Sequence, residues 1–427
     1  MGTPATTETT SRTFRLVRDP SLAVAAWTGA AATVTAQIWA AAFSPAFDHF
    51  ADLHVYWGAV QSLTRGAGLY GYAAANGDPF TYPPAAAIVM LPLAWLSESS
   101  AQVIWVVLEV AALLLLSWCV TRVVGCPPPL ASGAWMPVVL LTMAVSAPVA
   151  SNIHFGQVSL FVTTASAVTL LAGRSGIWAG LAAALKLTPL VLIPALLAWR
   201  RRTAVVTLAT FGAATVVGWS LLPAESARYW LRDLPGGSRY GDTALAGNQS
   251  ILGLLARHPT GHQTWVYLGL AAVVATFGTW RAVRYIQAGS RLAVFVIASG
   301  VALLIAPVSW THHEIPVVLA LFCVTARTPR RAWLLRACIL LVMTVNLSAL
   351  ATLPLPGSSL LSETRVLLIA YLVLVCRYRQ PAPAHARNIT PAVLNRETAR
   401  RPERDPPDLD APSSELVIRT LNVRRQD

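Results

Sequence analysis

Residues 102–122 read QVIWVVLEVAALLLLSWCVTR, an apolar run in which Glu109 is the only charge before Arg122. A helix needs about 20 such residues to cross the hydrocarbon core of a bilayer, so this run predicts a membrane span. Similar stretches recur from Ala23 to Cys376 with no gap long enough for a soluble domain. Only 12% of the 427 residues are charged and 55% are apolar, whereas a soluble domain carries about 25% charged residues. The sequence therefore predicts an all-α polytopic membrane protein.

Windows of this kind number about twelve. Arginine-rich clusters fall at alternate window ends, as the positive-inside rule expects of cytoplasmic ends. Within 122–176, however, Arg122 and Arg174 would lie outside, which favours a short or re-entrant helix there. The predicted windows are 21–43, 82–97, 102–122, 134–151, 157–173, 177–198, 203–222, 263–283, 291–308, 315–328, 332–352 and 361–376.

The window count gives a domain plan. Residues 1–20 form a cytoplasmic N-terminal segment, and an even number of spans returns the C-terminus to the cytoplasm. The membrane domain covers 21–376, and its longer connections, 44–81 and 223–262, face outward. Residues 377–427 are rich in proline and charge and are predicted to be a disordered basic tail.

The net charge of +13 is concentrated in the tail and at the span flanks. This distribution is typical of anchoring near anionic lipid, so the expected partners are membrane lipids and not nucleic acid. The five cysteines show no CxxC or paired spacing. A disulfide framework or a zinc site is therefore not expected.

The first outward segment carries two carboxylates, Asp48 and Asp52, one helical turn apart, and Tyr56 extends the same face. Such a pair near an apolar boundary could supply a general base, with Asp48, His54 and Tyr56 as candidate acceptor contacts. The alternative is an interfacial helix with an aromatic belt. The segment ends at Tyr82, where the following prolines begin the next helix.

Lys186 stands inside an apolar stretch and is the only lysine among the 32 basic residues. It is about 13 residues from the arginine cluster at 200–202, which places it roughly 20 Å from the inner boundary. An ammonium group this deep is expected to contact a phosphate, or else to form a structural pair at the break that Pro189 introduces.

Further polar residues interrupt the apolar windows. Trp310, His312 and His313 follow the window that ends at 308, and adjacent histidines do not have the i, i+4 spacing of a metal pair. One histidine is expected to donate a proton or bind an anion; an interfacial His-Trp belt is the alternative. Amide side chains suit sugar hydroxyls and phosphate oxygens, and the candidates are Gln157, Asn248 and Gln249.

Six short motifs, in order, resemble the polyprenol-phosphate-mannose-dependent α-mannosyltransferases of actinobacterial envelopes, glycosyltransferase family 87 of the GT-C superfamily. The matching motifs are Asp52-Leu53-His54-Val55-Tyr56, Tyr82-Pro83-Pro84, Gly156-Gln157-Val158, Lys186-Leu187-Thr188-Pro189, Asn248-Gln249-Ser250 and Ser309-Trp310 with His312-His313. The chain departs from the family pattern at Ser159, Ala306 and Thr311, where asparagine, serine and an acidic residue are expected.

The resemblance implies a GT-C-type fold and an inverting enzyme that moves mannose from polyprenyl-phosphate-mannose to a glycolipid acceptor of the phosphatidylinositol-mannoside or lipomannan type, with an α-1,2 linkage. It implies that Asp52 is the catalytic base on the extracytoplasmic side. Lys186 and one of the histidines would stabilise the departing phosphate, with Tyr82, Gln157, Asn248 and Gln249 as donor contacts and Trp310 as an acceptor contact. A lipid-phosphate donor requires no metal and no cofactor.

Two alternatives stay open at this point. An arabinofuranosyltransferase that uses decaprenyl-phosphate-arabinose would share the fold. A transporter or lipid flippase would also suit many spans with a charge at depth, but it should show paired halves with broken helices, and the sequence shows no such symmetry.

Overall fold

The computed structural model describes residues 20–43, 49–127, 132–236, 241–345 and 358–380. The N-terminal segment up to residue 19, Asp48 and the predicted tail beyond residue 380 lie outside the described residues. The regular secondary structure of the described part is helical except for a two-stranded antiparallel pair, β1 (Val324–Thr325) with β2 (Arg377–Tyr378), and an isolated bridge between Ala73 and Pro79. It is therefore all-α in class, as the sequence predicts.

Four described helices are long and apolar enough to cross a membrane. A fifth span results if the pair α6 (Ser132–Ala144) and α7 (Ala147–Phe155), bent by 67°, is counted as one. The bend falls within 122–176, where the sequence predicts a short or re-entrant helix. The four long helices are α2 (Pro20–Ala42), α5 (Glu98–Thr121), α11 (Arg201–Leu221) and α15 (Gln263–Gln287).

The structure does not confirm twelve spans, because several predicted windows are occupied by short or interrupted helices. Proline and glycine lie at several interruptions, and hydropathy averaged over a window does not detect them. The shorter helices in and between these windows are α4 (Pro84–Met90) with η1 (Leu91–Trp95), α8 (Ser159–Leu170), α9 (Ile177–Leu185), η2 (Thr188–Leu192) with α10 (Ile193–Trp199), α16 (Arg291–Ile305), α17 (Ile315–Val318), η5 (Leu319–Phe322), α18 (Pro329–Thr344) and α21 (Thr364–Leu374).

The two predicted outward segments are partly helical. The first contains α3 (Ala51–Thr64), and the second contains α12 (Pro223–Arg228), a π-helical turn η3 (Tyr229–Asp233), α13 (Leu234–Gly236) and α14 (Ile251–Arg257). Two short helices complete the described part: η4 (Thr311–Glu314) and α20 (Ser358–Leu361).

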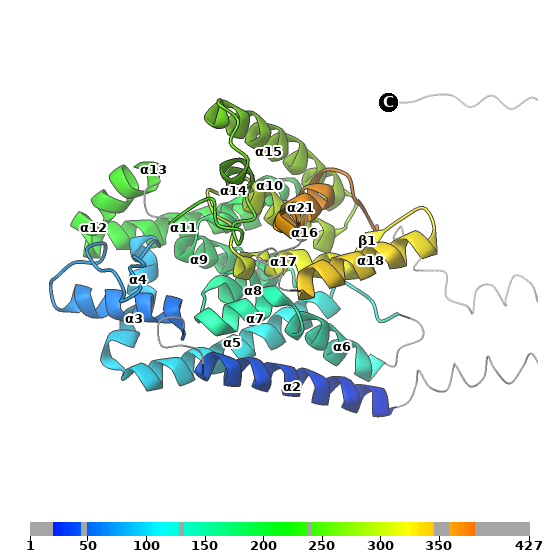
Figure 1. Ribbon diagram of the computed structural model, residues 1–427, viewed down its shortest axis with the longest axis horizontal. Helices are drawn as coiled ribbons and strands as arrows, with labels where there is room; N and C mark the ends of the chain where they lie inside the picture. The colour runs from blue at the N-terminus through cyan, green and yellow to red at the C-terminus, as the bar shows by residue number, and fades with distance from the viewer. Residues whose placement is uncertain (1–19, 44–48, 128–131, 237–240, 346–357, 381–427) are drawn as a thin grey trace, which may run out of the picture. The chain divides into compact units, whose positions relative to one another are not determined.

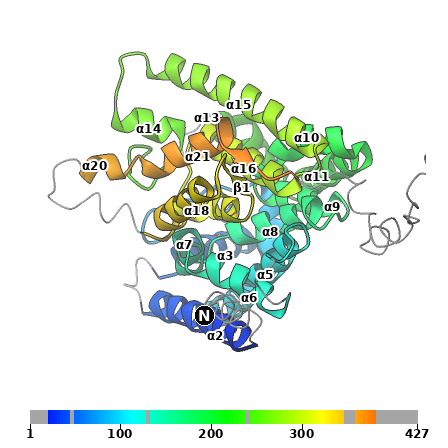
Figure 2. The same ribbon diagram turned by 90° about the vertical axis from the view of Figure 1, so that its right-hand side faces the viewer.

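Two apolar clusters hold these helices together. The larger cluster joins α5, α6, α7, α8, α16 and α21, and Figures 1 and 2 show α2 lying alongside α6 at its edge. The smaller cluster packs α3 against α4, η1 and the start of α5 through aromatic and aliphatic side chains, among them Tyr56, Phe80 and Trp105. The second cluster matters for function because it fixes α3, the helix that carries Asp52.

Candidate active site

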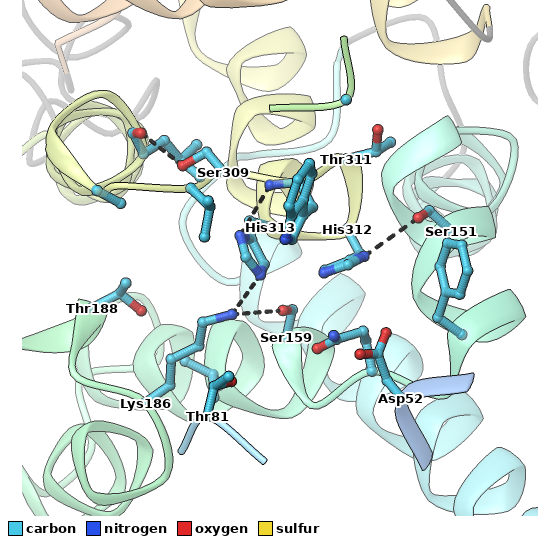
Figure 3. Close-up of a pocket in the computed structure, with 18 of the residues that line it drawn as sticks. Asp52, Thr81, Ser151, Ser159, Lys186, Thr188, Ser309, Thr311, His312 and His313 are labelled. Carbon is cyan, nitrogen blue, oxygen red and sulfur yellow. Dashed lines mark hydrogen bonds between the residues drawn. The ribbon is translucent and has the colours of Figure 1, made fainter. Parts of the chain in front are cut away.

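The central cavity has a volume of about 1520 Å³ and is bordered by α3, α7, α8, α16 and η4. Three breaks between helices open onto it: Gly156 between α7 and α8, Lys186 between α9 and η2, and the stretch 306–310 between α16 and η4. Figure 3 shows Lys186 from one break pointing toward His313 of η4, with His312 and Asp52 beside them. The sequence places these segments far apart, and the fold brings them to one place.

Asp52 lies in the first turn of α3 and lines the central cavity. The helix begins directly after Phe50, whose backbone is left-handed with φ of 44°. Tyr56, one turn further along, lines the same cavity and is fully buried. The predicted shared face of Asp52 and Tyr56 is therefore present in the structure.

Gly156 sets the distance between α3 and the corner that joins α7 to α8. Its φ is 66°, and a Cβ atom added there would lie 2.8 Å from the Cβ of Leu53, the neighbour of Asp52. Only a residue without a side chain fits this approach comfortably. The corner in turn positions Gln157, the next residue, against the cavity.

Tyr56, Tyr82 and Gln157 form a hydrogen-bonded row along the cavity wall. The two phenol oxygens are 3.1 Å apart, and the Tyr82 hydroxyl donates to Gln157 Oε1 over 3.1 Å. Burial, with smaller contributions from Tyr82 and Asp52, raises the pKa of Tyr56 well above its ordinary value. The row is consequently a neutral set of hydroxyl and amide groups beside the Asp52 carboxylate.

Lys186 terminates α9 with an extended backbone, φ −153° and ψ 127°, and its side chain enters the cavity. Its Nζ lies 2.6 Å from His313 Nε2 and 3.4 Å from Ser159 Oγ, as Figure 3 shows. The ring of Tyr82 lies below it, with the centroid 5.7 Å from Nζ. The structure thus joins Lys186, His313 and Tyr82, three of the predicted site residues.

The two adjacent histidines have different surroundings. His313 Nδ1 accepts a hydrogen bond from the Trp310 backbone N–H at 3.2 Å, and its Nε2 faces Lys186. His312 Nδ1 lies 3.5 Å from Ser151 Oγ, and among the described residues its Nε2 has no hydrogen-bond partner. Burial is the main cause that lowers the pKa of both histidines well below the ordinary value. Both rings are therefore neutral, and His312 has a nitrogen left to bind a ligand.

Three predicted residues do not line the cavity. The Asn248 amide is used by the backbone, since it donates to the carbonyls of Thr243 and Pro307 and accepts from the N–H of Ser309. The Gln249 amide donates to the carbonyls of Ala246 and Ser362 and accepts from the N–H of Val366. His54 lies 2.6 Å from Glu98 at the surface.

Arg365 of α21 lines the cavity and has no counterpart in the sequence prediction. Its guanidinium donates to Thr311 Oγ1 at 3.0 Å and lies 3.3 Å from the buried carboxylate of Glu314. A charge inside the apolar window 361–376 is the same signal that identified Lys186 and could have identified this residue. Trp310, a predicted contact, also lines the cavity.

The described residues contain no group of three His, Cys, Asp or Glu side chains that could hold a metal ion. The expectation that catalysis uses neither a metal nor a cofactor stays a prediction.

Comparisons with known proteins give a consistent set of matches. The model of glycosyltransferase family 87 matches residues 80–307, more than half of the chain. A polyprenol-phosphate-mannose-dependent alpha-(1-2)-phosphatidylinositol mannoside mannosyltransferase of Mycobacterium tuberculosis is 33% identical over 288 residues, which cover 61% of this chain and 67% of that protein. A polyprenol-phosphate-mannose-dependent alpha-(1-2)-phosphatidylinositol pentamannoside mannosyltransferase of Mycolicibacterium smegmatis is 34% identical over 280 residues, covering 62% and 67%. No solved structure matches significantly.

Proposed function

Because the chain belongs to glycosyltransferase family 87, we propose that it transfers mannose from polyprenyl-phosphate-mannose to a phosphatidylinositol-mannoside or lipomannan-type glycolipid. The linkage formed is α-1,2, and the reaction takes place on the outer face of the cytoplasmic membrane. The names of the similar mycobacterial enzymes support the donor, the linkage and the class of acceptor. The observation that carries the proposal is that Asp52 and the Lys186–His313 pair line one cavity.

The proposed reaction exchanges one bond for another at the anomeric carbon. An acceptor hydroxyl attacks that carbon from the face opposite the phosphate, Asp52 takes the hydroxyl proton, and the bond to the phosphate oxygen breaks with its electron pair. Attack from the opposite face inverts the configuration, so a β-linked mannosyl phosphate gives an α-mannoside.

The departing phosphate carries negative charge that the cavity must stabilise. Lys186 and the free Nε2 of His312 are the donors best placed to stabilise that charge, since both ring nitrogens of His313 already have partners. Loss of one such donor typically costs about 3 kcal/mol of transition-state stabilisation. Tyr82 and Gln157 flank Lys186 and are proposed donor contacts.

The volume of the cavity supports a reaction between two lipid-borne substrates. Sites for a single small molecule usually measure about 300 to 1,000 Å³, whereas this cavity measures about 1520 Å³. It accommodates the phosphate and sugar of a donor together with the terminal sugar of an acceptor.

Replacement of Asp52 by Asn tests the proposed base. The change keeps the size and hydrogen-bonding capacity of the side chain but removes its basicity, so we expect sugar transfer to fall by about 10²- to 10⁴-fold or more while the purified protein stays folded. Glu98→Gln is the matched control, because Glu98 occupies the first turn of α5 and lies outside the cavity. Undiminished transfer by Asp52→Asn excludes Asp52 as the base.

The donor and the acceptor need separate measurements. Purified protein incubated with labelled polyprenyl-phosphate-mannose and, in parallel, decaprenyl-phosphate-arabinose should form product from the mannose donor; product from the arabinose donor alone contradicts the proposal. Mass spectrometry of envelope glycolipids from a deletion strain should then show the accumulated acceptor.

A further inference from the structure

The hydrogen bonds of His313 fix the position of its ring hydrogen. The Trp310 backbone N–H donates to Nδ1 at 3.2 Å, so Nδ1 must present a lone pair. The His313 backbone N–H also donates to the Trp310 carbonyl at 2.8 Å, which holds this turn closed. A neutral imidazole with a lone pair on Nδ1 carries its single hydrogen on Nε2.

That hydrogen faces Lys186. The two nitrogens are 2.6 Å apart, so one of them must accept the hydrogen of the other. An ammonium group has three donors and no lone pair, and it cannot accept from an N–H group. An uncharged amine can accept, and it keeps two hydrogens for Ser159 Oγ and the face of the Tyr82 ring.

Other groups near Lys186 also influence whether it is an ammonium group or an uncharged amine. Asp52 on α3 favours the ammonium form through its negative charge. Tyr82, in the segment before α4, and His312, on η4, carry no charge to compensate an ammonium group. An ammonium group cannot accept the hydrogen of His313 Nε2, so this direct contact opposes the attraction of Asp52 and decides the state of the empty site.

We propose that His313 holds Lys186 as an uncharged amine while the cavity is empty, and that Lys186 takes up one proton from solvent when the phosphate of the lipid donor binds. The new ammonium group then donates to phosphate oxygens. His313 is in this scheme a positioning residue, which acts through Lys186. The inference rests on the proposed function, since it assumes a lipid-phosphate donor.

Proton uptake on binding can be measured with a ligand that does not itself titrate. Polyprenyl methyl phosphate is a diester, carries one negative charge throughout the working pH range and cannot transfer a sugar. Isothermal titration calorimetry of the full chain in nanodiscs, in buffers of different ionisation enthalpy, should give uptake of about one proton per bound diester near pH 8, and the affinity should fall about tenfold for each further pH unit.

Two variants separate the role of His313 from burial alone. His313→Asn keeps an oxygen for the Trp310 N–H and removes the group that faces Lys186, so proton uptake should fall toward zero. Lys186→Arg keeps a cation that cannot lose its proton, and it should bind the diester without uptake and with an affinity independent of pH.

The outcomes distinguish a failure of this inference from a failure of the proposed function. Binding to the wild-type chain without buffer-dependent heat, or unchanged uptake in His313→Asn, overturns the inference and leaves the proposed function intact. Failure of the wild-type chain both to bind the diester and to transfer mannose overturns the proposed donor and the inference with it.

Discussion

Gly156 shows how a single hydrogen atom in place of a side chain positions the proposed base. Its left-handed backbone and its contact with Leu53 together bring the α7–α8 corner onto the first turn of α3. Any side chain at this position meets two separate penalties. One is backbone strain, and the other is a steric conflict 2.8 Å from Leu53 Cβ.

Substitution of Gly156 by Ala should therefore destabilise the protein more than the same change at Gly66. Gly66 follows Arg65, the C-cap of α3, with a similar φ of 76°, but a Cβ atom there meets nothing within 4 Å. We expect about 1 to 2 kcal/mol from backbone strain at both positions, with an additional loss and a marked decrease in transfer for Gly156→Ala. Thermal unfolding and transfer rates measure both effects; equal losses in the two variants would contradict the assigned contact.

For single residues, the sequence identifies ionisable side chains at unusual positions but does not identify the hydrogen-bond partners of polar side chains. Lys186 and Asp52 are recognisable because an ionisable group in an apolar environment is energetically costly and usually has a function. The sequence predicts that Asn248 and Gln249 bind the donor, because their amides suit phosphate and sugar oxygens, yet their partners are backbone groups of distant segments, such as Pro307 and Val366. No local pattern reveals such long-range partners.

Among the elements, η4 depends on α21 for its position. Arg365 donates to the carbonyls of Val342 and Val345 and to Thr311, and it lies beside Glu314. Since η4 also carries both histidines, this single guanidinium connects the end of α18, α21 and the proposed phosphate site.

Removal of Arg365 should be more damaging than neutralisation of Glu314. Arg365→Met leaves a buried carboxyl and several backbone carbonyls without a donor, and loss of one partner of a buried pair typically costs about 3 to 5 kcal/mol. Glu314→Gln leaves the guanidinium with its other three acceptors, so a smaller loss is expected. Unfolding of both variants in denaturant tests the order, and the reverse order would contradict it.

Glu314 also predicts a pH effect in the same experiment. Burial raises its pKa from 4.5 to about 7, although Arg365 opposes the shift. The folded state therefore binds more protons than the unfolded state between these values, and its stability falls as the pH rises through about 7. Glu314→Gln should show a weaker decrease over this range than the wild-type chain.

The sequence predicts where helices lie along the chain better than it predicts where they are interrupted. All twelve apolar windows overlap helical segments, because hydrophobicity reports burial in protein or lipid. Breaks are predictable where proline marks them, as at Pro189 beside Lys186, or where arginine positions conflict with the span count, as within 122–176. The break at Gly156 depends on how tightly α3 packs there, which is a tertiary property.

For the whole molecule, the proposed mechanism requires Asp52 and the arginine-rich connection before α18 to face opposite sides of the membrane. Asn76 and Arg330 are exposed positions on these two regions. In a background with the exposed Cys338 replaced by Ser, Asn76→Cys should react with a membrane-impermeant maleimide on intact cells, whereas Arg330→Cys should react only after permeabilisation. The opposite labelling pattern would place the cavity on the cytoplasmic side and contradict the proposed mechanism.

The three helix breaks around the cavity also affect how the protein moves. Residues at helix ends lack the regular i to i−4 partners of a continuous helix, so such regions open at a lower free energy than the middle of α5 or α15. We therefore expect the cavity walls to part briefly while the long helices stay folded. Such a transient opening would admit a sugar carried on a lipid tail sideways from the bilayer and release the spent carrier.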